Sequence, residues 1–103
     1  MRVMLKVNIP VEDGNRAAKK GKLGQMIQAI LAEQKPEAVY FTADKGQRTG
    51  FLFLDMKESA DIPKLAEPWF LAFNAAVEMR PVMAPEDLAK AGPAIAQAAK
   101  KYG

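Results

Sequence analysis

The sequence predicts one α+β domain over residues 1–103, in which four strands form an antiparallel sheet and two helices cover one of its faces. Three observations predict this fold class. Residues 2–9 alternate between apolar and polar types, as one-sided strands do, and two later β-rich runs flank a compact glycine-containing connection. Apolar residues recur at helical spacing in two other stretches. The resulting order β-α-β-β-α-β (βαββαβ), followed by a C-terminal helix, is the ferredoxin-like arrangement.

The first strand is expected at residues 2–9, because its odd positions from Val3 onward are apolar and Pro10 cannot donate to a strand ladder. A helix is expected at residues 15–34, after a turn at residues 13–15 in which Asn15 caps the helix. Two glycines disfavour the first half of this helix, so residues 22–34 are its more regular part.

The second half of the chain continues the pattern of strands and helices. The expected elements are a hairpin of strands 37–44 and 49–56 around residues 45–48, a helix at 60–72, a strand at 75–83 and a C-terminal helix from residue 85. Pro68 is expected to bend or divide the second helix, and Gly92-Pro93 to split the last one. Pro81 indicates that its strand lies at the edge of the sheet, beside residues 2–9.

The composition excludes several classes of chemistry. The chain has no Cys and no His, which removes disulfides, thiolate nucleophiles, Ser-His-Asp triads, and metal or haem sites that use these residues. Its acidic residues are scattered without the spacing of a calcium loop, so we expect no metal site and no cofactor.

The net charge of +3 comes from 15 basic and 12 acidic residues, and the basic groups are concentrated near the start of the chain. Arg16, Lys19, Lys20 and Lys22 follow Gly14, but Leu23 stands where a phosphate loop has Ser or Thr. The simplest interpretation is a solvated basic helix face, so nucleic acid is not the expected partner. No signal peptide or transmembrane segment is apparent, and we expect a cytoplasmic protein without a membrane partner.

The sheet face opposite the helices carries an unusual mixture of apolar and charged groups. It is expected to hold Met4 and the six ligand-binding candidates Lys6, Asn8, Tyr40, Thr42, Glu78 and Arg80. One hairpin strand adds either Phe51 and Phe53 or Leu52 and Leu54, depending on its register. A second copy of the chain is the simplest cover for such a face, because two-fold dimers are the commonest oligomers. Two sheets packed in this way would enclose a space lined by these residues.

Each candidate also has an ordinary structural interpretation. Lys6, Glu78 and Arg80 could act as acid and base or bind an anion, but opposite charges on neighbouring strands also form simple stabilising pairs. Tyr40 and Thr42 could offer hydroxyls to a ligand, although strand tyrosines more often pack at a boundary. The single tryptophan is expected in the core or at an interface.

Three runs carry a resemblance to known proteins: KPEAVYFTADKGQRT, AEPWFLAFNAAVEMRPVM and PEDLAKAGPAIAQAAKKYG. The sequence resembles the dimeric α+β barrel superfamily and, more closely, a small uncharacterised bacterial family. The resemblance implies ferredoxin-like domains that pair sheet to sheet as a homodimer. The superfamily includes monooxygenases, isomerase-like enzymes, haem-degrading enzymes and ligand-binding regulators. Its histidine-dependent members find no match in this chain, so no catalytic residue is carried over.

The leading hypothesis is a small homodimeric protein that binds a small molecule in a cavity on the sheet face. One alternative is a cofactor-free monooxygenase- or isomerase-like enzyme that uses Lys6, Glu78, Arg80 or Tyr40. The other is a nucleic-acid-binding module that uses the basic stretch 16–22.

Overall fold

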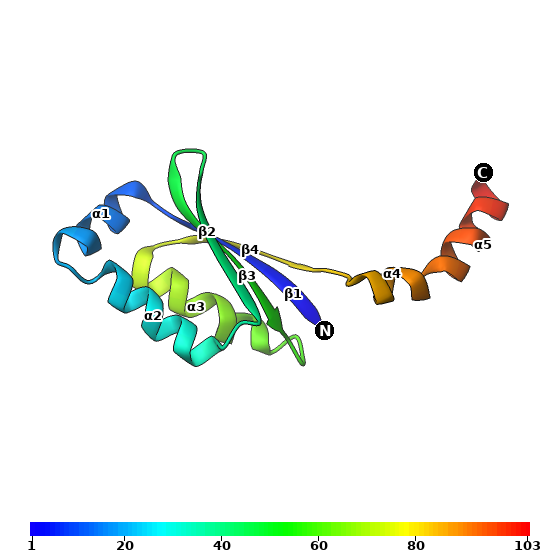
Figure 1. Cartoon of the computed structure of the whole chain (residues 1–103), viewed down its shortest axis with the longest axis horizontal. Coiled ribbons are helices and arrows are strands. Elements are labelled where there is room, and N and C mark those ends of the chain that lie inside the picture. Colours follow the sequence, from blue (N-terminus) through cyan, green and yellow to red (C-terminus); the bar gives the residue numbers. More distant parts are fainter.

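The structure is a computed structural model that describes residues 1–103 (Figure 1). Its elements, in chain order, are β1 (Arg2–Ile9), α1 (Val11–Lys19), α2 (Leu23–Gln34), β2 (Ala38–Asp44), β3 (Gln47–Asp55), α3 (Asp61–Phe73), β4 (Ala76–Pro81), α4 (Pro85–Lys90) and α5 (Gly92–Tyr102). None of these helices combines the length and apolarity needed to cross a bilayer.

The four strands form one antiparallel sheet in the order β2-β3-β1-β4. Helices α1, α2 and α3 lie on one side of this sheet, as Figure 1 shows. This α+β architecture is the ferredoxin-like fold, and it confirms the predicted fold class. Pro81 lies in β4 at the edge of the sheet, where a missing backbone donor is tolerated.

The core lies between the sheet and the three helices. β1 contributes every second residue, and β3 contributes Leu52 and Leu54 on the same face. From α3, Trp69 is 1 % exposed and its ring stacks on Phe73 with centroids 6.2 Å apart. Trp69 is therefore a core residue, as one interpretation of the sequence predicted.

The prediction of one helix over residues 15–34 is wrong for the first half of this range. The chain forms two helices there, and α1 already begins at Val11, so Asn15 lies inside α1 and does not cap it. Pro10 at the N-cap has its φ angle fixed by its ring at a value suited to the helix start. The negative charges of Glu12 and Asp13 in the first turn interact favourably with the positive end of the helix dipole. The break falls at residues 20–22, and residues 23–34 form the predicted regular part.

The hairpin is tighter than the four-residue connection predicted. Only Lys45 and Gly46 separate β2 from β3, and both have positive φ, at 53° and 76°. Such a two-residue turn matches the twist of antiparallel strands. The register opposes Lys6 to Phe51 and Met4 to Phe53, so the two phenylalanines lie on the open face of the sheet.

Pro68 does not divide α3, which is continuous. The C-terminal segment is split as predicted, since α4 and α5 meet at Ala91. Residues 82–103, called the C-terminal arm below, extend away from the sheet in Figure 1. The radius of gyration is 17.2 Å, against about 13 Å for a compact chain of this length. No residue of α4 or α5 is buried.

Candidate functional site

The open face of the sheet, on the side away from α1–α3, carries all six residues predicted to bind a ligand. The strand register aligns Lys6 with Phe51 and Glu78, and Phe51 in turn with Tyr40. The neighbouring rows hold Met4, Phe53, Ala38 and Arg80 on one side, and Asn8, Thr49, Thr42 and Ala76 on the other. The aromatic rings therefore lie together on β2 and β3, and the charged groups of these rows lie beside them on β1 and β4.

Lys6 is the centre of the charged groups on the open face. Its Nζ lies 2.8 Å from Asp44 Oδ2 and 3.9 Å from Glu78 Oε2, and 5.9 Å from the centroid of the Phe51 ring. Its side chain is only 20 % exposed. The predicted Lys6–Glu78 pairing is thus present, and the shorter contact goes to Asp44.

These contacts fix the protonation state of the pair. The hydrogen bond to Asp44 raises the pKa of Lys6 above the ordinary lysine value, partial burial opposes this, and the charges of Asp44 and Glu78 add to it. The same hydrogen bond holds the pKa of Asp44 below that of an ordinary aspartic acid. Lys6 therefore stays protonated at neutral pH and is poorly suited to act as a general base or amine nucleophile.

Asp44 was not among the candidates. It shares the alternation of Tyr40 and Thr42 along β2, and this alternation is the signal that could have found it. The sequence did not reveal its pairing because Lys6 reaches Asp44 across β3 rather than along a row of aligned residues.

The remaining candidate residues form few hydrogen bonds and no ion pairs. Asn8 Nδ2 donates to the hydroxyl of Thr49, 2.8 Å away, and Thr49 is buried. Tyr40 is 67 % exposed, and Thr42 makes one long contact to its neighbour's carbonyl. Arg80 takes part in none of the ion pairs of the chain. The open face thus combines paired groups with free hydroxyl, aromatic and guanidinium groups.

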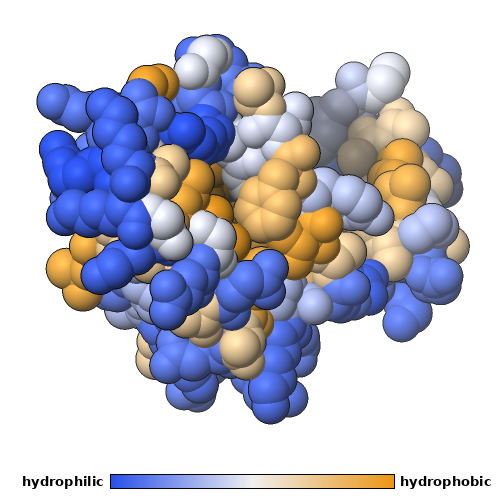
Figure 2. All heavy atoms as spheres, turned by 60° about the vertical axis from the view of Figure 1, so that its left-hand side comes forward, coloured by the Kyte–Doolittle hydropathy of each residue, from blue (hydrophilic) through white to orange (hydrophobic).

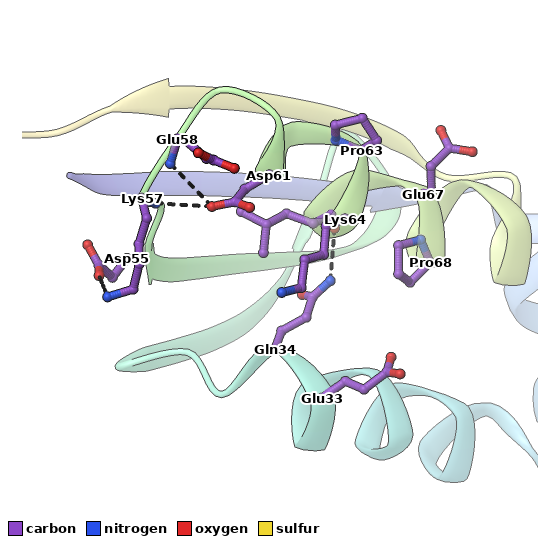
Figure 3. Close-up of a pocket in the computed structure, with 11 residues that line it drawn as sticks. Glu33, Gln34, Asp55, Lys57, Glu58, Asp61, Pro63, Lys64, Glu67 and Pro68 are labelled. Atoms are coloured by element: carbon purple, nitrogen blue, oxygen red, sulfur yellow. Dashed lines mark hydrogen bonds and ion pairs between the residues drawn. The ribbon is translucent and has the colours of Figure 1, made fainter.

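The open face is not a closed cavity within one chain. The four principal hollows of the surface lie elsewhere. The largest, about 720 Å³, lies between the end of α2, the start of α3 and the loop before α3 (Figure 3). The enclosed space was expected between two paired sheets, and it stays a prediction about the dimer.

Some of the polar groups of this largest hollow are paired with one another. Asp61 accepts hydrogen bonds from the backbone N–H groups of Lys57 and Glu58, and Asp55 pairs with Lys57 (Figure 3). Glu33 and Glu67 project from different helices in this view and do not converge. No group of three or more acidic residues in the chain is arranged to hold a metal ion.

The basic stretch lies on α1 and the turn that follows it. Arg16 pairs with Asp13 at 3.4 Å, whereas Lys19, Lys20 and Lys22 are exposed and form no ion pair. Figure 2, which brings the α1 side forward, shows a largely hydrophilic surface there. This arrangement agrees with a solvated basic helix face.

No protein-family model matches the chain, and no curated protein matches it. Among solved structures, a formyltetrahydrofolate deformylase from Pseudomonas putida is similar with a TM-score of 0.49 and 18 % sequence identity. The match covers 80 % of this chain and 29 % of that chain, so this chain spans less than a third of that enzyme's length. The likeness carries no conclusion about activity.

Proposed function

We propose that two copies of this chain pair through the open faces of their sheets and bind a small molecule between them, without catalysing a reaction. The observation that carries this proposal is the uncovered sheet face on which Met4, Phe51 and Phe53 lie among charged groups. The sequence resemblance to dimeric α+β barrel proteins supports the same pairing.

The apolar part of the open face favours a partner over water. Phe51, Phe53 and Met4 are each half-buried, although no helix covers them. Burying the rest of these side chains would contribute about 25 cal/mol for each Å² removed from water. The polar groups beside them, Tyr40 and Arg80, are free to hydrogen-bond a ligand enclosed between the two sheets.

The C-terminal arm offers the apolar area that the open faces lack for a stable dimer. Strands about 4.8 Å apart and about seven residues long give the four-stranded face an area of roughly 450 Å². Two such faces fall below the about 1,200 Å² buried in stable protein interfaces. The arm carries the exposed side chains Leu88, Ile95 and Tyr102, and packing these on the second copy would complete the interface.

Binding is favoured over catalysis by the state of Lys6. Its ammonium group is held between Asp44 and Glu78, and its pKa is raised. A lysine that works as a base or nucleophile needs a lowered pKa. With no His or Cys in the chain, we assign Lys6 the role of a fixed positive charge at the site.

The dimer is tested by measuring the molar mass with light scattering at micromolar concentration. We expect twice the chain mass of 11.3 kDa, and a mass near 11.3 kDa would refute the pairing. Phe53→Lys places a charge on the open face and should give monomers. The matched control is Leu71→Lys, since Leu71 is 80 % exposed on α3, outside the proposed interface, and its substitution should leave the mass unchanged.

The ligand is tested by denaturing the purified protein and identifying released molecules by mass spectrometry, together with a thermal-shift screen of small metabolites. We expect a compound that stabilises the wild type and Leu71→Lys but not Tyr40→Ala. A dimer that releases nothing and is stabilised by nothing in the screen would argue for a purely structural pairing.

A further inference from the structure

A second hollow lies on the opposite face of the sheet, beneath the helices and beside the hairpin. It has a volume of about 410 Å³, within the range of small-molecule pockets. We call it the Gly50 pocket. Its walls are formed by Val7, Ile9, Ile27, Phe41, Thr42, Ala43, Arg48, Thr49, Gly50, Leu52 and Trp69.

Gly50 makes room in the sheet for the ring of Phe41, which forms one wall of the pocket. It lies in the middle of β3, opposite Val7 on one neighbouring strand and Phe41 on the other. Its alternation with Leu52 directs this position toward the helices, where a side chain would otherwise fill the core. A Cβ at residue 50 would lie 3.1 Å from the ring of Phe41, which is tighter than ordinary contact. Glycine inside a strand is unfavourable, and here it accommodates the Phe41 ring of the neighbouring strand.

The apolar wall of the pocket is only partly covered. The ring of Phe41 remains 56 % exposed, although it faces the helix side of the sheet. Ile27 of α2 is half-buried, while Trp69 of α3 forms a fully buried wall. An apolar ligand body would therefore cover surface that the chain itself leaves in contact with water.

Arg48 supplies the only charged side chain of the pocket. Its guanidinium group packs against α1 at Gly14. Its Nη1 lies 2.6 Å from the point that a Cβ on Gly14 would occupy. None of the ion pairs in the chain involves Arg48. A planar, permanently charged donor group of this kind suits the two oxygens of a carboxylate.

From these observations we infer that the Gly50 pocket binds a small apolar carboxylate, with its hydrocarbon or aryl body against Phe41 and Ile27 and its carboxylate on Arg48. This site lies on the helix side of the sheet, and of the open-face residues only Thr42 and Thr49 also line it. It is therefore independent of the proposed function, and either one can fail without the other.

Octanoate is a suitable probe, because it joins a flexible apolar body to one carboxylate. Trp69 is the only tryptophan and lines the pocket, so its fluorescence reports occupancy directly. We expect a saturable fluorescence change with octanoate and a much weaker one with octanol, which lacks the charge. A parallel calorimetric titration measures the affinity without relying on the tryptophan.

Arg48→Gln should weaken octanoate binding by about ten- to a hundred-fold, the usual effect of losing a charge-assisted hydrogen bond. Arg16→Gln is the matched control, because it removes the same charge from α1 outside the pocket. Gly50→Val should abolish binding, because a side chain at residue 50 displaces the Phe41 ring that forms one wall of the pocket. Ile27→Phe fills it from the helix side, so binding can still be tested if the valine variant does not fold.

Three results would overturn the proposal. One is no saturable signal with millimolar octanoate. Another is equal binding of octanoate and octanol, with no loss in Arg48→Gln, which would indicate unspecific adsorption to apolar surface. The third is wild-type affinity in a folded Ile27→Phe variant, which would place octanoate elsewhere on the protein.

Discussion

Gln34→Ala should destabilise the protein strongly, although Gln34 is a polar residue at the end of a helix. Its side-chain amide joins α2 to α3. Trp69 Nε1 donates to Gln34 Oε1 at 3.2 Å, and Gln34 Nε2 donates to the backbone carbonyl of Leu65 at 2.9 Å. The same residue lines the polar hollow of Figure 3, while Trp69 lines the Gly50 pocket. The hydrogen bond between them therefore joins a lining residue of one hollow to a lining residue of the other.

The expected loss in free energy of unfolding follows from these two hydrogen bonds. Each neutral hydrogen bond contributes about 1 kcal/mol to the free energy of unfolding. The indole N–H belongs to a side chain that is almost fully buried, and leaving it unsatisfied costs about 1–3 kcal/mol. The total is about 2–4 kcal/mol, which corresponds to a fall in Tm of roughly 10–30 °C for a domain of this size.

Urea unfolding followed by circular dichroism measures this change, and the dependence of the free energy on urea should be unaltered. The matched background is Trp69→Phe, which has no indole N–H to leave unpaired. In that background Gln34→Ala should cost only about 1 kcal/mol, for the lost bond to Leu65. If Gln34→Ala costs the same in both backgrounds, or less than about 0.5 kcal/mol in the wild type, the amide does not join the helices as described.

Three further predictions concern other parts of the chain. The lowered pKa of Asp44 means that its pair with Lys6 stabilises the fold above the ordinary carboxyl pKa, and this effect is lost as the pH falls through the folded-state pKa. The unfolding free energies of wild type and Asp44→Asn, measured with urea, should therefore differ at pH 7 and converge as the pH falls below the ordinary aspartate pKa. Gly24→Ala should stabilise α2 by about 0.5 kcal/mol, because a Cβ there meets nothing within 4 Å, and a lower urea midpoint would contradict this. The Phe53→Lys variant, in which the open faces cannot pair, is the background for a deletion of residues 84–103. The deletion should change the free energy of unfolding by less than about 0.5 kcal/mol, since α4 and α5 bury no residue.

Most of the fold could be predicted from local patterns. The alternation of residues 2–9 identified β1 to the residue, and Pro81 indicated an edge strand before any topology was known. The start of the first helix was missed because Asp13-Gly14-Asn15 has the composition of a turn. In the structure these residues continue a helix that begins directly after Pro10, where Arg48 packs against Gly14. That contact depends on tertiary structure and leaves no local signal.

The candidate site was predicted in part. Strand periodicity placed Lys6, Tyr40 and Glu78 on one face, because each strand has a period of two. It did not predict that Lys6 pairs most closely with Asp44, which depends on the path of a long side chain across β3. The Gly50 pocket was also missed, since a gap in a core depends on how three strands and two helices meet.

The two edges of the sheet differ in how they would behave while the chain folds. Edge strand β4 contains Glu78, Arg80 and Pro81, which discourage pairing with another strand. Edge strand β2 runs through residues 38–43 without a charge or a proline, and its composition strongly favours extended structure. Lys35-Pro36-Glu37 precedes it and Asp44-Lys45 follows it, as flanking residues that limit aggregation do. Aggregation of incompletely folded chains is therefore expected to begin by strand addition at β2.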